Sequence, residues 1–369
     1  MDKKKEPAMV EEPTGQVNKR KKKGWTKWEI IGTAILVALL ITLGVNADSI
    51  SGLFTTIFAE IQSNVWDTFI TGPVGVFIVA SIIFGCILER LGMTDGLIRI
   101  YTPIAKLINM NPTVMVPAVY NVLGDSTAAS RIGGPVLLKA GCTKNEIQIA
   151  LATLIQAPFT FSNIALSLIF LVAAGVNPLP VMILGIFLPA LILPVILRYT
   201  IYRDCKYVDG AEIPSFTPNT GPVELIFGAA ATGMELLLLT IVPILIALFF
   251  VIGALVHFGV WDYIQAPIKA ICEFCNIYGP EGVTSIVISP AVAAPNMLEL
   301  VASGVITRKV AIGTFILTTA SMTLNSAFGD YPKLWSQFTG VKYGALIPPV
   351  FIGWIFKLLV CLIVSNILA

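Results

Sequence analysis

Residues 121–135 read Asn-Val-Leu-Gly-Asp-Ser-Thr-Ala-Ala-Ser-Arg-Ile-Gly-Gly-Pro, and they place an acid, a base, three hydroxyls and three glycines between two apolar runs. A charge at membrane depth costs about 2.5–3.5 kcal/mol on insertion scales, so an acid in such a segment is a functional candidate. Asp125 is therefore predicted to bind a coupling cation, either Na⁺ or a proton. The alternative interpretation is that Asp125 caps a helix or pairs with Arg131.

The hydroxyls that follow Asp125 suit the start of a half-helix. Ser126, Thr127 and Ser130 can accept hydrogen bonds from the first backbone N–H groups of such a helix. The positive N-terminal end of the helix would then face a cavity, where it favours an anionic or strongly polar group. Together with Asn121, these three residues are predicted to bind a substrate.

A second polar group occupies residues 282–303, another apolar segment that is interrupted by prolines. Pro295 and Asn296 indicate a break and the start of a half-helix. Asn296 and Glu299 are predicted to bind substrate from this side, although Glu299 could instead face the outer surface.

Polar residues within the apolar runs complete the candidate site. Gln156 and Asn163 flank Pro158, while Asn325 and Ser326 follow a run of threonines in the second half of the chain. We expect these four residues to contact substrate. The alternative is ordinary hydrogen bonding between helices, which contributes only about 0.6 kcal/mol per bond on average.

The composition indicates the environment of these residues. The chain has 369 residues, of which 56% are hydrophobic and 12% are charged, whereas a soluble domain has about 25% charged residues. This predicts a multi-pass integral protein of the cell inner (plasma) membrane. The basic cluster between Lys3 and Lys27 predicts a cytoplasmic N-terminus with affinity for anionic lipids, and we expect no nucleic-acid partner.

The reactive residue types are few. A single histidine, His257, argues against a multi-histidine metal site and against a Ser/His/Asp hydrolase, so we expect neither an enzyme nor a bound metal. Cys272-x-x-Cys275 is an isolated pair that we interpret as packing residues, with a redox role left open. No cofactor is expected apart from Na⁺ as a coupling ion.

The elements that must position the site follow from the apolar runs. We expect about seven transmembrane helices, with unbroken spans including 147–173 and 310–323, and two re-entrant helical hairpins at 103–138 and 282–303. Backbone that is neither helix nor barrel persists at membrane depth only where protein buries it or a cavity faces it. The expected divisions are a disordered basic tail at 1–28, a first helix with an interfacial segment at 29–72, a repeat at 73–203, a cytoplasmic loop at 204–222 and a second repeat at 223–369. The first apolar run is interpreted as a retained signal anchor rather than a cleaved signal peptide.

The two repeats have elements in the same order. Gly92-Met-Thr-Asp95 corresponds to Gly259-Val-Trp-Asp262, and Pro103 corresponds to Pro267. Each repeat has an odd number of spans, so the second is expected to be inverted in the membrane. Inverted repeats with paired broken helices are typical of secondary transporters, whose site lies near the midplane.

The stretches ILERLGMTDGLIRIYTPIAKLI (87–108) and NPTVMVPAVYNVLGDSTAASRIGGPVLLKAG (111–141) resemble the nucleoside-recognition, or Gate, domain family of bacterial membrane proteins. That family includes spore-maturation membrane proteins and is related to concentrative nucleoside transporters. The resemblance covers residues 75–200 well and the second half more loosely, and Asn121–Ala129 is its most specific part. It implies two re-entrant hairpins and an elevator-like motion, whereas the substrate does not carry over because members handle varied solutes.

The sequence thus predicts an all-α polytopic secondary transporter with alternating access around two hairpin tips. Its substrate would be a small polar solute, either nucleoside-like, an amine or an organic acid, carried with Na⁺ or H⁺. Membrane lipids and further copies of the chain are the expected partners. The alternative is a non-transporting scaffold or assembly partner of the spore-maturation type.

Overall fold

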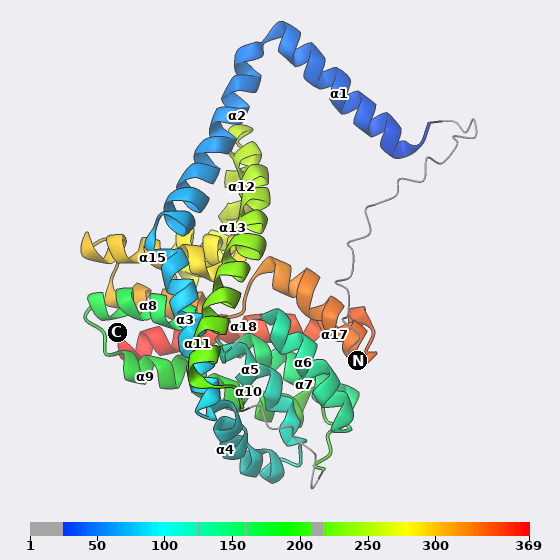
Figure 1. Ribbon diagram of the computed structural model, residues 1–369, viewed down its shortest axis with the longest axis vertical. Coiled ribbons are helices and arrows are strands. Elements are labelled where there is room, and N and C mark those ends of the chain that lie inside the picture. Colours follow the sequence, from blue (N-terminus) through cyan, green and yellow to red (C-terminus); the bar gives the residue numbers. More distant parts are fainter. Residues whose placement is uncertain (1–24, 124–125, 159–160, 209–216, 218) are drawn as a thin grey trace, which may run out of the picture. The chain divides into compact units, whose positions relative to one another are not determined.

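A computed structural model describes residues 25–123, 126–158, 161–208, 217 and 219–369, and every regular element in these ranges is helical (Figure 1). The chain forms two compact units, Met1–Phe54 and Thr55–Ala369. In the first unit, Thr26 and Glu29 form a capping box that begins α1 (Lys27–Val45). This unit also contains the start of α2 (Ala47–Ile61).

Four helical stretches in the described part of the chain are long and apolar enough to cross a membrane. About seven were expected, and the difference arises because other apolar runs are short or interrupted helices. The long stretches mark an integral membrane protein. They are Lys27–Gly44 in α1; α9 (Pro178–Met182), η3 (Ile183–Phe187) and α10 (Leu188–Thr200); α11 (Pro222–Glu235), η4 (Leu236–Ile241) and α12 (Val242–His257); and α18 (Tyr343–Leu368).

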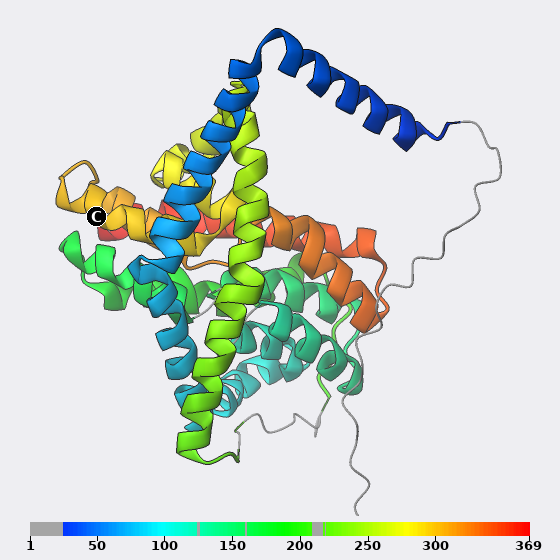
Figure 2. The same ribbon diagram turned by 45° about the horizontal axis from the view of Figure 1, so that its top comes forward.

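The longest of these stretches, α11 to α12, lies beside α3 in both views of the ribbon (Figures 1 and 2). Gly233 permits this approach, since a Cβ at that position would lie 3.2 Å from the Cα of Val79. Gly253 allows a second close contact, with Ile57 of α2. The elements between α2 and α11 that pack here are η1 (Gln62–Ile70) and α3 (Pro73–Arg90).

Both interrupted segments expected to fold as hairpins do fold as helical hairpins. The first consists of η2 (Pro112–Met115), α5 (Val116–Leu123) and α6 (Ser126–Lys139). The second consists of α14 (Gly279–Val283), η5 (Thr284–Ile288) and α15 (Pro290–Ala302). We refer to them as hairpin 1 and hairpin 2.

Hairpin 2 turns at a different residue from the one expected. Pro295 and Asn296 were expected to break the helix, but α15 is continuous through both residues. The chain instead turns at Ser289, which is extended with φ −166° and ψ 141°. Pro290 explains this, because proline disfavours a helical residue before it and is tolerated at the first helical position.

Neither of the two runs expected to be unbroken spans forms one helix over its whole length. The first divides into α7 (Lys144–Gln156) and α8 (Phe161–Ala173). Ala157 is extended with ψ 149°, as the following Pro158 requires. The second run, expected to reach about Thr323, ends early at Thr318 in α16 (Arg308–Thr318), and the chain then continues into a helix made of η6 (Ser326–Asp330) and α17 (Tyr331–Thr339). There the Thr319 hydroxyl bonds the Phe315 and Ile316 carbonyls, a local bond that competes with helix continuation.

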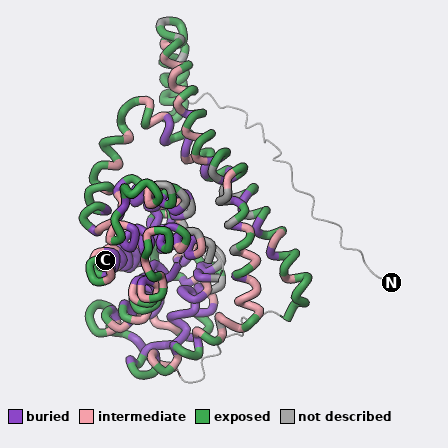
Figure 3. The backbone as a smooth tube through the Cα atoms, turned by 90° about the vertical axis from the view of Figure 1, so that its left-hand side faces the viewer, coloured by how far each residue is buried: buried purple, intermediate pink, exposed green. Residues whose placement is uncertain are grey.

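The repeat predicted from the sequence is visible in the backbone. Gly92 (φ 82°) precedes α4 (Met93–Leu107), and Gly259 (φ 66°) precedes α13 (Trp261–Phe274). In each repeat an amphipathic helix is followed by a hairpin and then by a helix capped by Thr143 or Thr307. Buried positions gather in one packed group of helices (Figure 3). Most residues of α7 and α16 are buried.

Candidate functional site

The two interrupted helices meet at their breaks. Pro158 and Ala320 form an antiparallel backbone bridge, so the two repeats run in opposite directions where they touch, as inversion requires. On one side of the bridge, the Ser167 and Thr318 hydroxyls lie 2.9 Å apart and join α8 to α16. We refer to the segments 156–158 and 320–321 as the crossing.

Hairpin 1 reaches the crossing through Asn121, near the end of α5. Its amide nitrogen donates to the Pro158 carbonyl at 2.7 Å and to the Ser321 hydroxyl at 2.6 Å. Its amide oxygen is buried and has no hydrogen-bond partner among the described residues. Asn121 therefore joins one hairpin to both helix breaks. Its amide oxygen has the chemistry to accept a hydrogen bond from a substrate or to coordinate a cation.

Gln156 is the last residue of α7 and lies on the same crossing. Its amide nitrogen donates to the Gly353 carbonyl in α18 at 2.7 Å. Its amide oxygen is buried and, within the described ranges, accepts no hydrogen bond. Asn163, the other predicted residue of this run, is buried in the first turn of α8.

Lys357 of α18 was not singled out from the sequence. Its ammonium donates to the Gln156 and Gly185 carbonyls, both at 3.1 Å, and the side chain is 0% exposed. The sequence did contain a signal, because Lys357 is the only charge in the apolar run 344–367.

The second break also begins a half-helix, with Thr323 as its cap. The Thr323 hydroxyl accepts from the Ser326 backbone N–H at 3.1 Å and lies 2.6 Å from the Ser326 hydroxyl. Ser326 is buried, whereas the neighbouring Asn325 is exposed. A cap of this kind was expected, but from the hydroxyls of hairpin 1.

The predicted residues of hairpin 1 have separate positions. Ser126 and Thr127 form the first turn of α6, as expected for the start of a half-helix. The Ser130 hydroxyl accepts from the buried Trp335 indole N–H at 3.1 Å, which joins α6 to α17. Asp125, the predicted cation ligand, lies outside the described residues.

The predicted residues of hairpin 2 lie on α15. Asn296 is exposed, and its amide nitrogen is 3.4 and 3.5 Å from the two carboxylate oxygens of Glu281 across the hairpin. Burial raises the pKa of Glu281 to about 7, while the Asn296 amide acts in the opposite direction. Glu299 lies three residues further along α15, which packs against α8 and α16.

A small apolar pocket of about 230 Å³ adjoins the crossing. Its volume is below the range of roughly 300–1,000 Å³ that is typical of sites for drug-sized ligands, and it suits an apolar group better than a polar solute. It is lined by Leu97, Ile100, Tyr101, Met115, Ala118, Val119, Val122, Ala157, Pro158, Ile186, Phe187, Ala190 and Leu191.

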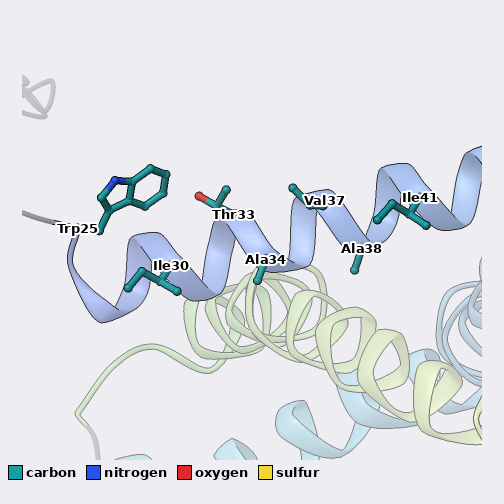
Figure 4. Close-up of a pocket in the computed structure, with 7 residues that line it drawn as sticks. All are labelled: Trp25, Ile30, Thr33, Ala34, Val37, Ala38 and Ile41. Carbon is teal, nitrogen blue, oxygen red and sulfur yellow. The ribbon is translucent and has the colours of Figure 1, made fainter.

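A second depression, of about 420 Å³, lies along α1 (Figure 4). Seven residues between Trp25 and Ile41 line it, and only Thr33 has a hydroxyl. One face of a single helix does not enclose a ligand. Among the described residues no group of three or more His, Cys, Asp or Glu side chains is placed to hold a metal ion.

Two helical hairpins, two helices interrupted where they cross and several long apolar helices define an all-helical membrane fold built from two inverted repeats. Solved structures of CNTnw, a concentrative nucleoside transporter, are similar to this chain. The match to CNTnw in an inward-facing, substrate-bound state has a TM-score of 0.61 at 14% identity, and it covers 94% of this chain and 88% of the CNTnw chain. A doubly substituted form in an outward-facing state has a TM-score of 0.58 at 15% identity, covering 92% and 86%.

A singly substituted form of CNTnw, in its intermediate 3 state, has a TM-score of 0.53 at 16% identity and covers 93% of this chain and 88% of that chain. No protein-family model matches the chain, and no curated protein matches its sequence significantly. At these identities the similarity establishes the fold.

Proposed function

We propose that this chain is a secondary transporter that moves a small polar solute by alternating access. The observation that carries the proposal is the position of Asn121, which bonds both interrupted helices at the point where they cross. Interrupted helices at membrane depth supply free backbone groups and helix ends for a solute or an ion. Support also comes from the fold, since structures of the similar CNTnw represent outward-facing, inward-facing and intermediate states.

The solute belongs, in this proposal, to the nucleoside-like compounds, the amines or the organic acids. The end of α5, the break after Gln156 and the capped helix that follows Thr323 contact it. These places offer amide oxygens, amide nitrogens and a helix N-terminus, which together suit a compound with several hydrogen-bonding groups.

The coupling ion is Na⁺ or H⁺, and its ligands are the Asn121 amide oxygen and Asp125. A buried oxygen without a hydrogen-bond partner is a ligand of the hard type that Na⁺ prefers.

The transporter lies in the plasma membrane with a cytoplasmic N-terminus, binds lipid and assembles with further copies of itself. Its relation to the Gate domain family is part of the same proposal.

A binding screen of the purified chain in detergent tests the proposal. The panel contains nucleosides, nucleobases, amino acids, amines and organic acids, each with and without Na⁺ at two pH values. A ligand at a hundredfold its Kd stabilises the protein by about 2.7 kcal/mol, which a melting curve detects. We expect one chemical class to raise the Tm. A well-folded protein that responds to none of them would favour the scaffold alternative.

Substitution of Asn121 then links the ligand to the crossing. We expect Asn121→Leu to abolish uptake of that ligand into proteoliposomes, because the side chain keeps its size and loses both donor and acceptor. Asn366→Leu is the matched control, since Asn366 is exposed near the end of α18 and its amide nitrogen donates to the Leu362 carbonyl of the same helix. Equal uptake by the two variants would contradict a site at the crossing.

A further inference from the structure

Lys357 is a fully buried cation in the middle of a long apolar helix, and among the described side chains it has no carboxylate partner. Taking an ammonium out of water is strongly unfavourable unless hydrogen bonds compensate for the lost hydration. The two hydrogen bonds that the ammonium donates, to the Gln156 and Gly185 carbonyls, must therefore account for the burial of this charge.

Both carbonyls belong to places where helical hydrogen bonding is irregular. Gln156 is the last residue of α7, and the final carbonyls of a helix lack intrahelical donors and carry the negative end of its dipole. Gly185 lies within η3, a π-helical turn, where the bonding register changes. In addition, the Gln156 side-chain oxygen has no partner within the described part of the chain. A cluster of carbonyl oxygens at a helix C-terminus is what a monovalent cation would bind.

We propose that Lys357 is a tethered cation, whose ammonium fills the place of a bound monovalent ion at the C-terminal end of α7. The ammonium joins the break of the first repeat to the closing helices of both repeats, α9–α10 and α18. The crossing therefore assembles without an ion from solution at this position.

A consequence for transport follows, and it rests on the proposed function. Since Lys357 already occupies the end of α7, an ion that drives transport binds elsewhere, on the Asn121 side of the crossing. The role of Lys357 is to position the crossing and to restrict where ions bind.

The competing explanation is that Lys357 only fills space. A methionine at this position distinguishes the tethered cation from a side chain that only fills space, because methionine is unbranched, similar in length to lysine and without charge or hydrogen-bond donor. We expect Lys357→Met to lower the Tm of the purified full chain by about 5 °C or more, since two buried carbonyls lose their donor. The matched control is Lys333→Met, which removes an exposed lysine from α17 and is expected to leave the Tm within about 1 °C.

Replacement by a small cation tests the proposal directly. Lys357→Ala opens a space beside the carbonyls, and we expect methylammonium or ethylammonium chloride to recover at least half of its loss in Tm. Choline chloride at the same ionic strength is too bulky and should recover none. The wild-type chain should show no comparable difference between these salts.

Two results would overturn the proposal: a Lys357→Met protein as stable as the wild type, or a Lys357→Ala protein that recovers equally in all salts. These melting experiments need neither a substrate nor an ion gradient. Failure of the transport proposal, seen as a silent ligand screen, is therefore distinguishable from failure of the tethered cation.

Discussion

At the scale of single residues, the carboxylate of Glu146 holds three backbone N–H groups from separate parts of the chain. One oxygen accepts from Asn111 at 2.8 Å and from Lys206 at 3.0 Å, and the other accepts from Thr143 at 2.8 Å. The side chain is 0% exposed. Glu146 thus joins the start of hairpin 1, the start of α7 and the segment after α10.

We expect Glu146→Gln to destabilise the protein by about 2 kcal/mol, because an amide replaces a charged acceptor and must turn a donor toward an N–H group. Thermal unfolding in detergent measures this change. Glu224→Gln, at an exposed position in the first turn of α11, is the control and should have little effect. Equal Tm values for the two variants would show that these hydrogen bonds do not stabilise the fold.

Glu281 predicts a dependence of stability on pH. It lies in α14, outside the four long apolar helices, and burial raises its pKa from 4.5 to about 7. An acid with a raised pKa binds its proton more tightly when folded, so its contribution to stability falls as the pH rises from about 4.5 through about 7. We expect a loss of up to about 3 kcal/mol over this range. Glu281→Gln should remove that part of the pH dependence, whereas an unchanged profile would assign it to other groups.

The candidate residues were predictable in part. Asn121 and Gln156 were selected as polar residues beside glycine or proline in apolar runs, and both lie at the crossing. Lys357 was overlooked because its partner carbonyls lie 201 and 172 positions away, and spacing alone does not reveal such contacts. Whether Asp125 binds a cation remains a prediction.

At the scale of elements, the order of helices and the two hairpins could be predicted from the apolar pattern. The breaks in the helices were harder to locate, because a proline can either end a helix or lie within one. Pro158 and Pro290 follow extended residues, whereas Pro103 and Pro267 lie inside continuous helices. The packing around each proline decides between these outcomes.

Glycine determines how closely these elements approach. A Cβ at Gly313 in α16 would overlap the backbone carbonyl oxygen of Asn276, which cannot easily move. We expect Gly313→Ala to destabilise the protein by about 2 kcal/mol or more. Gly228→Ala in α11 is the control, since nothing lies within 4 Å of its added Cβ, and this substitution should be neutral or slightly stabilising. Chemical or thermal unfolding of both variants makes the comparison, and a stable Gly313→Ala protein would refute the close approach.

At the scale of the whole molecule, Tyr120 of α5 donates to the Glu89 carboxylate of α3 at 3.2 Å. This bond joins hairpin 1 to the helix that packs along α11. If the chain works as proposed, with a bundle that carries the hairpins moving against a group of helices that includes α3, this contact breaks and reforms in every transport cycle.

Cross-linking across this boundary is therefore expected to stop transport. With cysteines at positions 89 and 120, in a chain freed of its native cysteines, a short bifunctional thiol reagent should arrest uptake reversibly. The control pair at positions 167 and 318 joins α8 to α16 beside the crossing, and cross-linking there should leave uptake largely intact. If uptake continues after positions 89 and 120 are cross-linked, α3 and hairpin 1 move together.

The bond between Lys357 and Gln156 also has a consequence for biosynthesis. The chain is made from its N-terminus, so 200 further residues are added before the donor for the end of α7 exists. During that time the first repeat lies in the bilayer, while the Gln156 carbonyl lacks the Lys357 donor and Pro158 lacks its backbone partner Ala320. A first repeat expressed alone should therefore be a substrate for membrane quality control, and co-expression of the second repeat as a separate chain should rescue it.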